Sequence, residues 1–109
     1  MQDKITKLFK AVADPTRRDI FHALVIATSA LSITQISNQF DMSRQGVTKH
    51  IKTLEDAGLV HLDTKGRERF CNANAKPLKE LNKWIQFYDQ FWDDSLDNLD
   101  NYLNTSKHG

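Results

Sequence analysis

The stretch SITQISNQFDMSRQGVTKHIKTLEDAGL, which runs from Ser32 to Leu59, decides the fold of this chain. Its pattern predicts two short helices separated by a tight turn. Ser32 opens a capping box, which satisfies the first free amides of a helix. Ser43 is a typical N-cap for the second helix, and Gly58 is a typical residue just beyond a helix end. We therefore predict a helix-turn-helix over residues 32–58.

The second helix of this motif has two distinct faces. Its apolar residues recur at the spacing of an amphipathic helix, and they are Val47, Ile51 and Leu54. The opposite face carries cationic and hydrogen-bonding side chains, namely Arg44, Gln45, Thr48, Lys49 and Lys52. Arg and Gln suit base edges, whereas Lys suits phosphates. Because a helix-turn-helix places the start of its second helix in the major groove of DNA, these residues and Ser43 are candidate DNA contacts.

The sequence that follows this helix predicts a β-hairpin, LVHLDTKGRERFCNA at residues 59–73. Strand-forming residues precede and follow a predicted turn, residues 64–67, that contains a glycine. Three basic side chains lie at or near the tip, where phosphates or a minor groove are within reach, and they are Lys65, Arg67 and Arg69. A hairpin joined directly to a helix-turn-helix makes a winged helix. The expected fold class is mainly α with a small β-hairpin.

Helical patterns also flank the winged-helix segment. Residues 4–13 predict a first helix, and Asp14-Pro15 predicts the start of a second. The last predicted helix, residues 75–103, is much longer than a small domain needs, and its apolar positions have coiled-coil-like spacing. A second copy of the chain would cover this wide face, which comprises Leu81, Trp84, Ile85, Tyr88, Phe91, Trp92, Leu96 and Leu99. The alternative is that the helix wraps its own domain.

Length and composition are those of one globular domain. The chain has 109 residues, of which 39% are apolar and 27% charged, and its net charge is +1. Basic residues outnumber acidic residues in the segment 1–76, and acidic residues outnumber basic residues in the segment 77–109. The predicted DNA contacts therefore lie in the basic part of the chain. The N-terminus lacks a signal-peptide pattern, and the longest apolar run is too short to cross a membrane. One cysteine fits a reducing compartment, so we expect a cytoplasmic protein without a membrane partner.

Three segments carry a family resemblance: ADPTRR at residues 13–18, SRQGVTKHIKTLEDAGLV at 43–60 and GRERF at 66–70. Together they resemble the ArsR/SmtB family of bacterial winged-helix repressors, and the aromatic pattern of the last helix resembles a metal-independent subgroup. The resemblance implies a homodimer joined through the first and last helices, which adds Leu8 to the expected dimer interface. It also implies two recognition helices on an inverted-repeat operator, with repression released by a signal that the sequence does not identify.

Metal-sensing members of this family use cysteines in the helix before the recognition helix, or histidines and carboxylates on the last helix. Here the first of these helices has neither Cys nor His, and the last predicted helix offers Asp89, Asp93 and Asp97 without an imidazole. Carboxylates alone are a poor site for a transition metal, so we predict no metal and no other cofactor. Two residues depart from the family pattern, Gly46 and Cys71. For Cys71, a redox role stays open beside that of a small apolar filler.

These patterns favour a homodimeric, sequence-specific DNA-binding regulator of transcription, in particular a repressor. The alternative is a winged helix used for protein interaction, which would not need Arg44, Gln45, Thr48 and Lys49 on one face. No nucleophile–base pair or phosphate-binding glycine loop is visible, so an enzyme is not indicated. A small apolar effector among the aromatic residues of the last helix is a further possibility, although a packed dimer interface explains them more simply.

Overall fold

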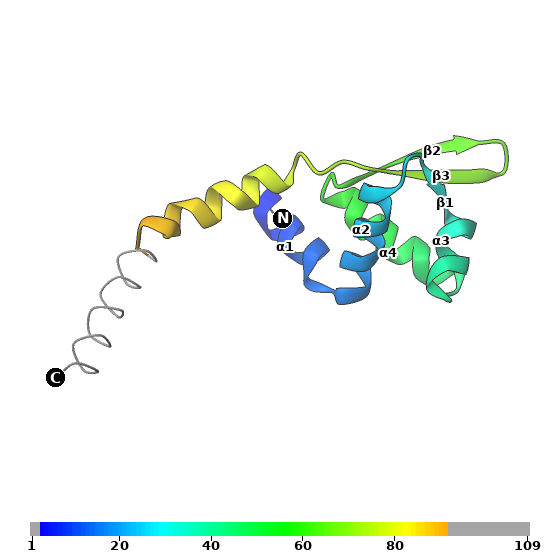
Figure 1. Ribbon diagram of the computed structural model, residues 1–109, viewed down its shortest axis with the longest axis horizontal. Coiled ribbons are helices and arrows are strands. Elements are labelled where there is room, and N and C mark those ends of the chain that lie inside the picture. The colour runs from blue at the N-terminus through cyan, green and yellow to red at the C-terminus, as the bar shows by residue number, and fades with distance from the viewer. Residues whose placement is uncertain (1–2, 92–109) are drawn as a thin grey trace. The chain divides into compact units, whose positions relative to one another are not determined.

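The computed structural model describes residues 3–91 of the chain. In chain order its elements are α1 (Lys4–Ala13), α2 (Pro15–Ile26), β1 (Leu31–Ser32), α3 (Ile33–Phe40), α4 (Arg44–Asp56), β2 (Val60–Lys65) and β3 (Glu68–Ala73) (Figure 1). Residues 78–91 are also helical. The chain divides into two compact units, Met1–Lys79 and Glu80–Gly109. The predicted fold class, a mainly helical winged helix-turn-helix, is confirmed.

Local capping explains where the helices of the first unit begin. The side chains of Asp3, Asp14, Ser32 and Ser43 each accept a hydrogen bond from the backbone N–H three residues later. At Ser32 the reciprocal bond of the capping box is also present, because Gln35 Oε1 accepts from the Ser32 N–H at 2.8 Å. These interactions replace bonds that the first turn of a helix cannot make internally. The predicted caps Asp14, Ser32 and Ser43 are therefore confirmed.

The turn between α3 and α4 and the end of α4 both use left-handed backbone. Asp41 adopts φ 52°, and the Ser37 hydroxyl donates to the Met42 carbonyl within this turn. Gly58 adopts φ 78°, and the N–H groups of Gly58 and Leu59 bond back to carbonyls of the last turn of α4, both at 2.9 Å. This pair of bonds is a Schellman motif, in which glycine relieves the steric cost of positive φ. It leads directly from α4 into β2.

The sheet has three antiparallel strands in the order β1-β3-β2, one more than the predicted hairpin. β1 pairs Leu31 with Cys71 and Ser32 with Phe70. Its two residues are too few for the alternating pattern that identifies a strand in a sequence. In the hairpin, Lys65 pairs with Glu68, so residues 66–67 form a two-residue loop and the turn spans 65–68, one position later than the predicted turn over 64–67. Gly66 has φ 62° at the loop position where a type II′ turn places glycine.

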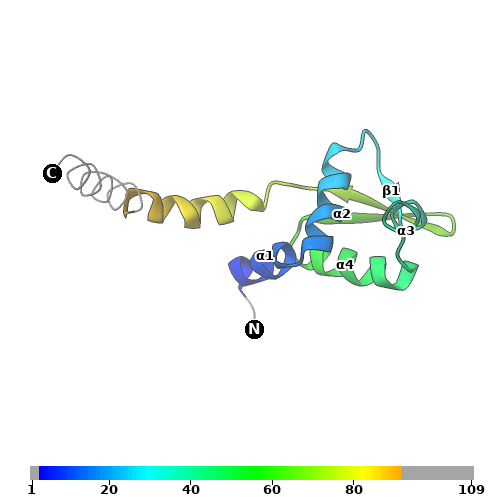
Figure 2. The same cartoon turned by 60° about the horizontal axis from the view of Figure 1, so that its bottom comes forward.

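The core of the first unit lies where α1, α2 and α4 pack together and against the sheet (Figure 2). Its fully buried side chains include Leu8, Ile20, Ile36, Val47, Ile51, Leu54, Leu59 and Cys71. Leu8 has no exposed surface and Leu81 is 8% exposed, so each leaves little for a second copy to contact. Their place in a dimer interface stays a prediction.

The last helix begins at residue 78, three residues later than predicted. Before it, the Asn74 carboxamide accepts a bond from the Lys76 N–H at 3.3 Å and donates to the Gly58 carbonyl at 3.2 Å, which forms a turn instead of a first helical turn. Residues 92–103 of the predicted helix lie outside the described residues, including Trp92, Leu96 and Leu99. Within the second unit, a row of large apolar side chains is exposed, namely Trp84, Ile85, Phe87, Tyr88 and Phe91.

Candidate nucleic-acid interface

The first turns of α4 present the polar face that the sequence indicates. Arg44, Gln45, Lys49 and Lys52 are exposed, and Thr48 is half-buried. The opposite face is closed, because Val47, Ile51 and Leu54 are at most 1% exposed. Ser43 caps the helix by accepting the Gly46 N–H at 3.0 Å, so its hydroxyl is already used within the protein. The N-terminal half of α4 thus offers a row of donors and cations that no core contact occupies.

A shallow hollow joins this face of α4 to the sheet. Its volume is about 510 Å³, and it is lined by Ile33, Arg44, Gln45, Thr48, Lys49 and Arg69. Arg69 Nη2 lies 3.5 Å from Thr48 Oγ1, and that hydroxyl also bonds to the Arg44 carbonyl at 2.8 Å. The lining carries three cations and no carboxylate, so its electrostatics favour an anion such as a phosphate. The sequence placed Arg69 after the predicted turn, near the hairpin tip, and the structure adds that β3 brings it beside α4.

The hairpin tip is a separate group of charges. Lys65 and Arg67 are exposed there, and Lys65 Nζ lies 5.8 Å from the centre of the Phe70 ring. Such a cation–π contact orients a lysine without neutralising it. Glu68 pairs across the strands with Lys65, and its charge partly offsets the cations of the tip. The tip is therefore a weaker anion site than the hollow beside α4.

Gly46 lies next to the cap of α4. A Cβ atom on Gly46 would lie 3.2 Å from Ser43 Oγ, which is tighter than ordinary packing, and 3.4 Å from Met42 Cε. Glycine in a helix costs about 1 kcal/mol relative to alanine. The caps of α1, α2 and α3 bond to Thr6, Arg17 and Gln35, so such a cap does not itself require glycine.

Comparisons with known proteins agree with this geometry. A family model described as a helix-turn-helix domain matches residues 12–63, which include the whole motif and β2 up to Asp63. YuzN of Bacillus subtilis (strain 168), an uncharacterized HTH-type transcriptional regulator, is 42% identical over 86 residues, 72% of this chain and 92% of YuzN. The crystal structure of an ArsR family transcriptional regulator superposes with a TM-score of 0.73 at 29% identity, covering 83% of this chain and 91% of that one. This chain belongs to the ArsR family.

A second relative of this ArsR-family chain carries a functional name. The transcriptional repressor SdpR of Bacillus subtilis (strain 168) is 26% identical over 81 residues, 74% of this chain and 88% of SdpR. The resemblance drawn from the sequence is therefore confirmed at the level of the family. Membership makes the chain a transcriptional regulator with a helix-turn-helix fold, whereas its place in a metal-independent subgroup stays a prediction.

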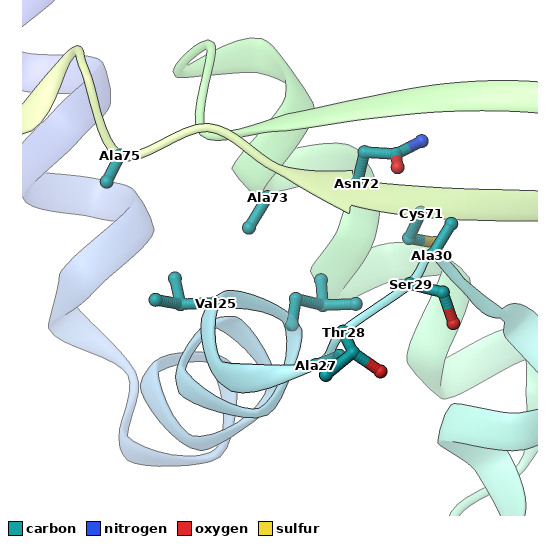
Figure 3. Close-up of a pocket in the computed structure, with 10 residues that line it drawn as sticks. Val25, Ala27, Thr28, Ser29, Ala30, Cys71, Asn72, Ala73 and Ala75 are labelled. Atoms are coloured by element: carbon teal, nitrogen blue, oxygen red, sulfur yellow. The ribbon is translucent and has the colours of Figure 1, made fainter.

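Cys71 lies in the sheet of the ArsR-family chain and not on an accessible surface. It is fully buried, and burial raises the pKa of its thiol to about 11. Figure 3 shows it beside Ala30, at the wall of a small pocket of about 290 Å³ between the end of α2 and β3. Because the thiolate is the reactive form, a thiol with this pKa is inert near neutral pH. This environment favours the filler interpretation over a redox role.

We expect Cys71 of the native protein to resist alkylation at pH 7.5, because burial excludes the reagent and keeps the thiol protonated. Reaction with iodoacetamide, followed by mass spectrometry, should leave the folded chain unmodified over a time in which the denatured chain is fully modified. The denatured sample is the control for reagent activity. Rapid modification of the folded chain at this pH would contradict the buried environment.

The described residues of the ArsR-family chain show no candidate metal centre. Between residues 3 and 91, no three or more His, Cys, Asp or Glu side chains lie close enough together to hold a metal ion. Of the three aspartates on the predicted last helix, Asp93 and Asp97 lie outside that range, so metal independence stays a prediction. Over the same range, no helix is long and apolar enough to cross a membrane.

Proposed function

We propose that this chain is a homodimeric repressor that binds an inverted-repeat operator in double-stranded DNA. The observation that carries the proposal is the exposed face of α4, which offers Arg44, Gln45 and Lys49 beside Arg69 with no carboxylate among the residues lining the hollow. A protein-interaction module has no need for such a cationic, donor-rich surface. Membership in a family of transcriptional regulators and the similarity to the repressor SdpR support the same function.

The residues of this surface divide into two roles. Arg44 and Gln45 lie in the first turn of α4, the part of a recognition helix that enters the major groove, and their side chains can form paired hydrogen bonds with guanine and adenine. Lys49, Lys52 and Arg69 suit phosphates, and Ser43 holds the helix end. Thr48 bonds to Arg69 and to the Arg44 carbonyl, so we assign it a linking role between the hairpin and α4.

The second unit supplies the argument for two copies. The side chains of Ile85, Tyr88 and Phe91 are 48–55% exposed in the protomer, and they lie on one helix together with Trp84. A large exposed apolar patch usually marks an interaction site. A second copy of the same helix would cover this patch with apolar side chains of the same kind. The two-fold axis of such a dimer would present two recognition helices to successive major grooves, about 34 Å apart.

Selection of bound fragments from random duplex DNA tests the proposal. The purified full-length chain should enrich an inverted repeat whose half-sites are about one helical turn apart. The matched control is the double variant Arg44→Ala/Gln45→Ala, which keeps the phosphate contacts and should enrich nothing. Transcription in vitro from a promoter that contains the selected sequence should fall as the chain is added. No enrichment by the wild type, or enrichment of a single unrepeated half-site, would refute the proposal.

The hairpin tip should contribute through phosphate and not through base edges. Replacing Lys65 or Arg67 with alanine should weaken binding to all duplexes alike and flatten the log–log salt dependence of affinity by about one unit per lost phosphate contact. Titrations at several salt concentrations measure both effects. Lys83→Ala, on an exposed lysine outside the first unit, is the control for loss of net charge. Unchanged slopes for both tip variants would exclude DNA contact by the hairpin.

A further inference from the structure

Arg17 lies at the junction of three helices. Its Nε donates to the Ala11 carbonyl at 2.9 Å, and its Nη2 donates to the Lys10 carbonyl at 2.8 Å. Both carbonyls belong to the last turn of α1, where a helix leaves its carbonyls without internal partners. The remaining nitrogen, Nη1, lies 3.1 Å from Nδ1 of His50 on the recognition helix. One side chain of α2 therefore bonds to α1 and to α4 at once.

The chemistry of this contact sets the state of His50. A guanidinium only donates hydrogen bonds, so Nδ1 of His50 must accept with its lone pair, and the ring must carry its proton on Nε2. A proton on Nδ1 would abolish the bond in either case, and a doubly protonated ring would also place two cations against each other. The contact with Arg17 therefore exists only while His50 is neutral.

We propose that Arg17 is a positioning residue for the recognition helix and that it acts only while His50 Nδ1 is unprotonated. His50 lies two residues after Thr48 on α4, where its link to Arg17 fixes the rotation of the helix relative to α1 and α2. This inference rests on the proposed DNA-binding function.

The surroundings of Arg17 include one carboxylate. The Asp14 carboxylate accepts the backbone N–H of Arg17 at 2.9 Å, and this bond is the main reason that the pKa of Asp14 is lowered. The bond caps the start of α2, the helix that carries the guanidinium. Arg17 is therefore held by the cap of its own helix and by the carbonyls of α1.

Arg18 provides a matched control. Its Nη1 donates to the Val12 carbonyl at 2.7 Å, so it also caps the end of α1 and carries the same charge. No bond from Arg18 to α4 is present among the described residues. Both Arg17→Met and Arg18→Met remove a cation and capping bonds to α1, two bonds for Arg17 and one for Arg18. Only Arg17→Met removes the contact with His50.

The test compares affinity for the selected operator with affinity for a scrambled duplex at one salt concentration and pH 8. Arg17→Met and His50→Leu should each lower the ratio of the two affinities about tenfold, which corresponds to about 1.4 kcal/mol. Arg18→Met should leave the ratio unchanged. His50→Asn keeps an acceptor oxygen in the position of Nδ1 and should retain most of the wild-type ratio. Combining Arg17→Met with His50→Leu should cause no further loss, because both remove the same contact.

Two measurements keep the proposal testable if Arg17→Met does not fold. Nitrogen-15 NMR of the wild type at pH 8 should show His50 protonated on Nε2, and a proton on Nδ1 would overturn the contact. A His50→Leu protein with the wild-type ratio would overturn the positioning role. A wild type that selects no sequence would instead refute the proposed function, and the tautomer would still be measured.

Discussion

Sedimentation of Ile85→Asp should show a monomer at concentrations where the wild type is a dimer, and this is the largest effect that we expect. Ile85 is 49% exposed in the protomer and lies beside Trp84 and Tyr88, with which it lines a hollow of about 520 Å³ in the second unit. A carboxylate buried at this position in a dimer would lose its hydration without gaining a partner. Operator affinity should fall at least about a hundredfold, because the two half-sites would then be bound independently.

The matched control for this variant is Gln86→Asp. This variant introduces the same residue and the same change of charge one position along the same helix. Position 86 is rotated about 100° around the helix axis from Ile85, away from the side that carries Trp84 and Tyr88. We expect Gln86→Asp to sediment as the wild type does. A wild type that stays monomeric at concentrations of about ten micromolar or more would exclude the dimer. A transcriptional regulator that works as a dimer must associate at such concentrations or below.

Loss of base readout should be the second largest effect. Gln45→Ala should cost roughly 1–3 kcal/mol on the preferred operator and little on random DNA, since a paired contact with a base edge discriminates by that amount. Arg44→Ala should cause a similar loss of affinity for the operator, through a contact with a different base pair. Both side chains are exposed in the first turn of α4 and line the hollow that contains Arg69.

Lys52→Ala provides the contrast, because a lysine on the outer face of α4 suits phosphate and should weaken operator and scrambled duplex by similar factors. All three variants are compared with the wild type at one salt concentration, by fluorescence anisotropy on both duplexes. If Gln45→Ala weakened both duplexes equally, or neither, this part of α4 would not read sequence.

Much of the candidate site was predictable because it depends on local interactions. Ser32, Ser43 and Gly58 act on backbone groups within a few residues, so the ends of α3 and α4 follow from short sequence patterns. The apolar stripe of α4 follows from helical periodicity, which also assigns Arg44 and Gln45 to the opposite face. The fold class and the family could therefore be inferred from the chain alone.

Other features depend on residues far apart in the sequence, and no local pattern encodes them. β1 exists because two residues pair with β3, some 40 positions later. Leu8 and Val25 both occupy apolar positions of predicted helices, yet one is fully buried and the other 47% exposed, since burial depends on which elements pack nearby.

The same distinction separates the basic residues. In the sequence, Arg69 lies at or near the predicted hairpin tip, and Arg17 lies in the ADPTRR segment without an assigned contact. The register of β3 brings Arg69 to Thr48, and the packing of α2 on α4 brings Arg17 to His50. Residue type and helical periodicity thus specified which surface of α4 is polar, through interactions within one or two turns of helix. Its partners within the protein were specified only by long-range packing, because a hydrogen bond across 21 or 33 residues requires the whole fold to bring its two ends together.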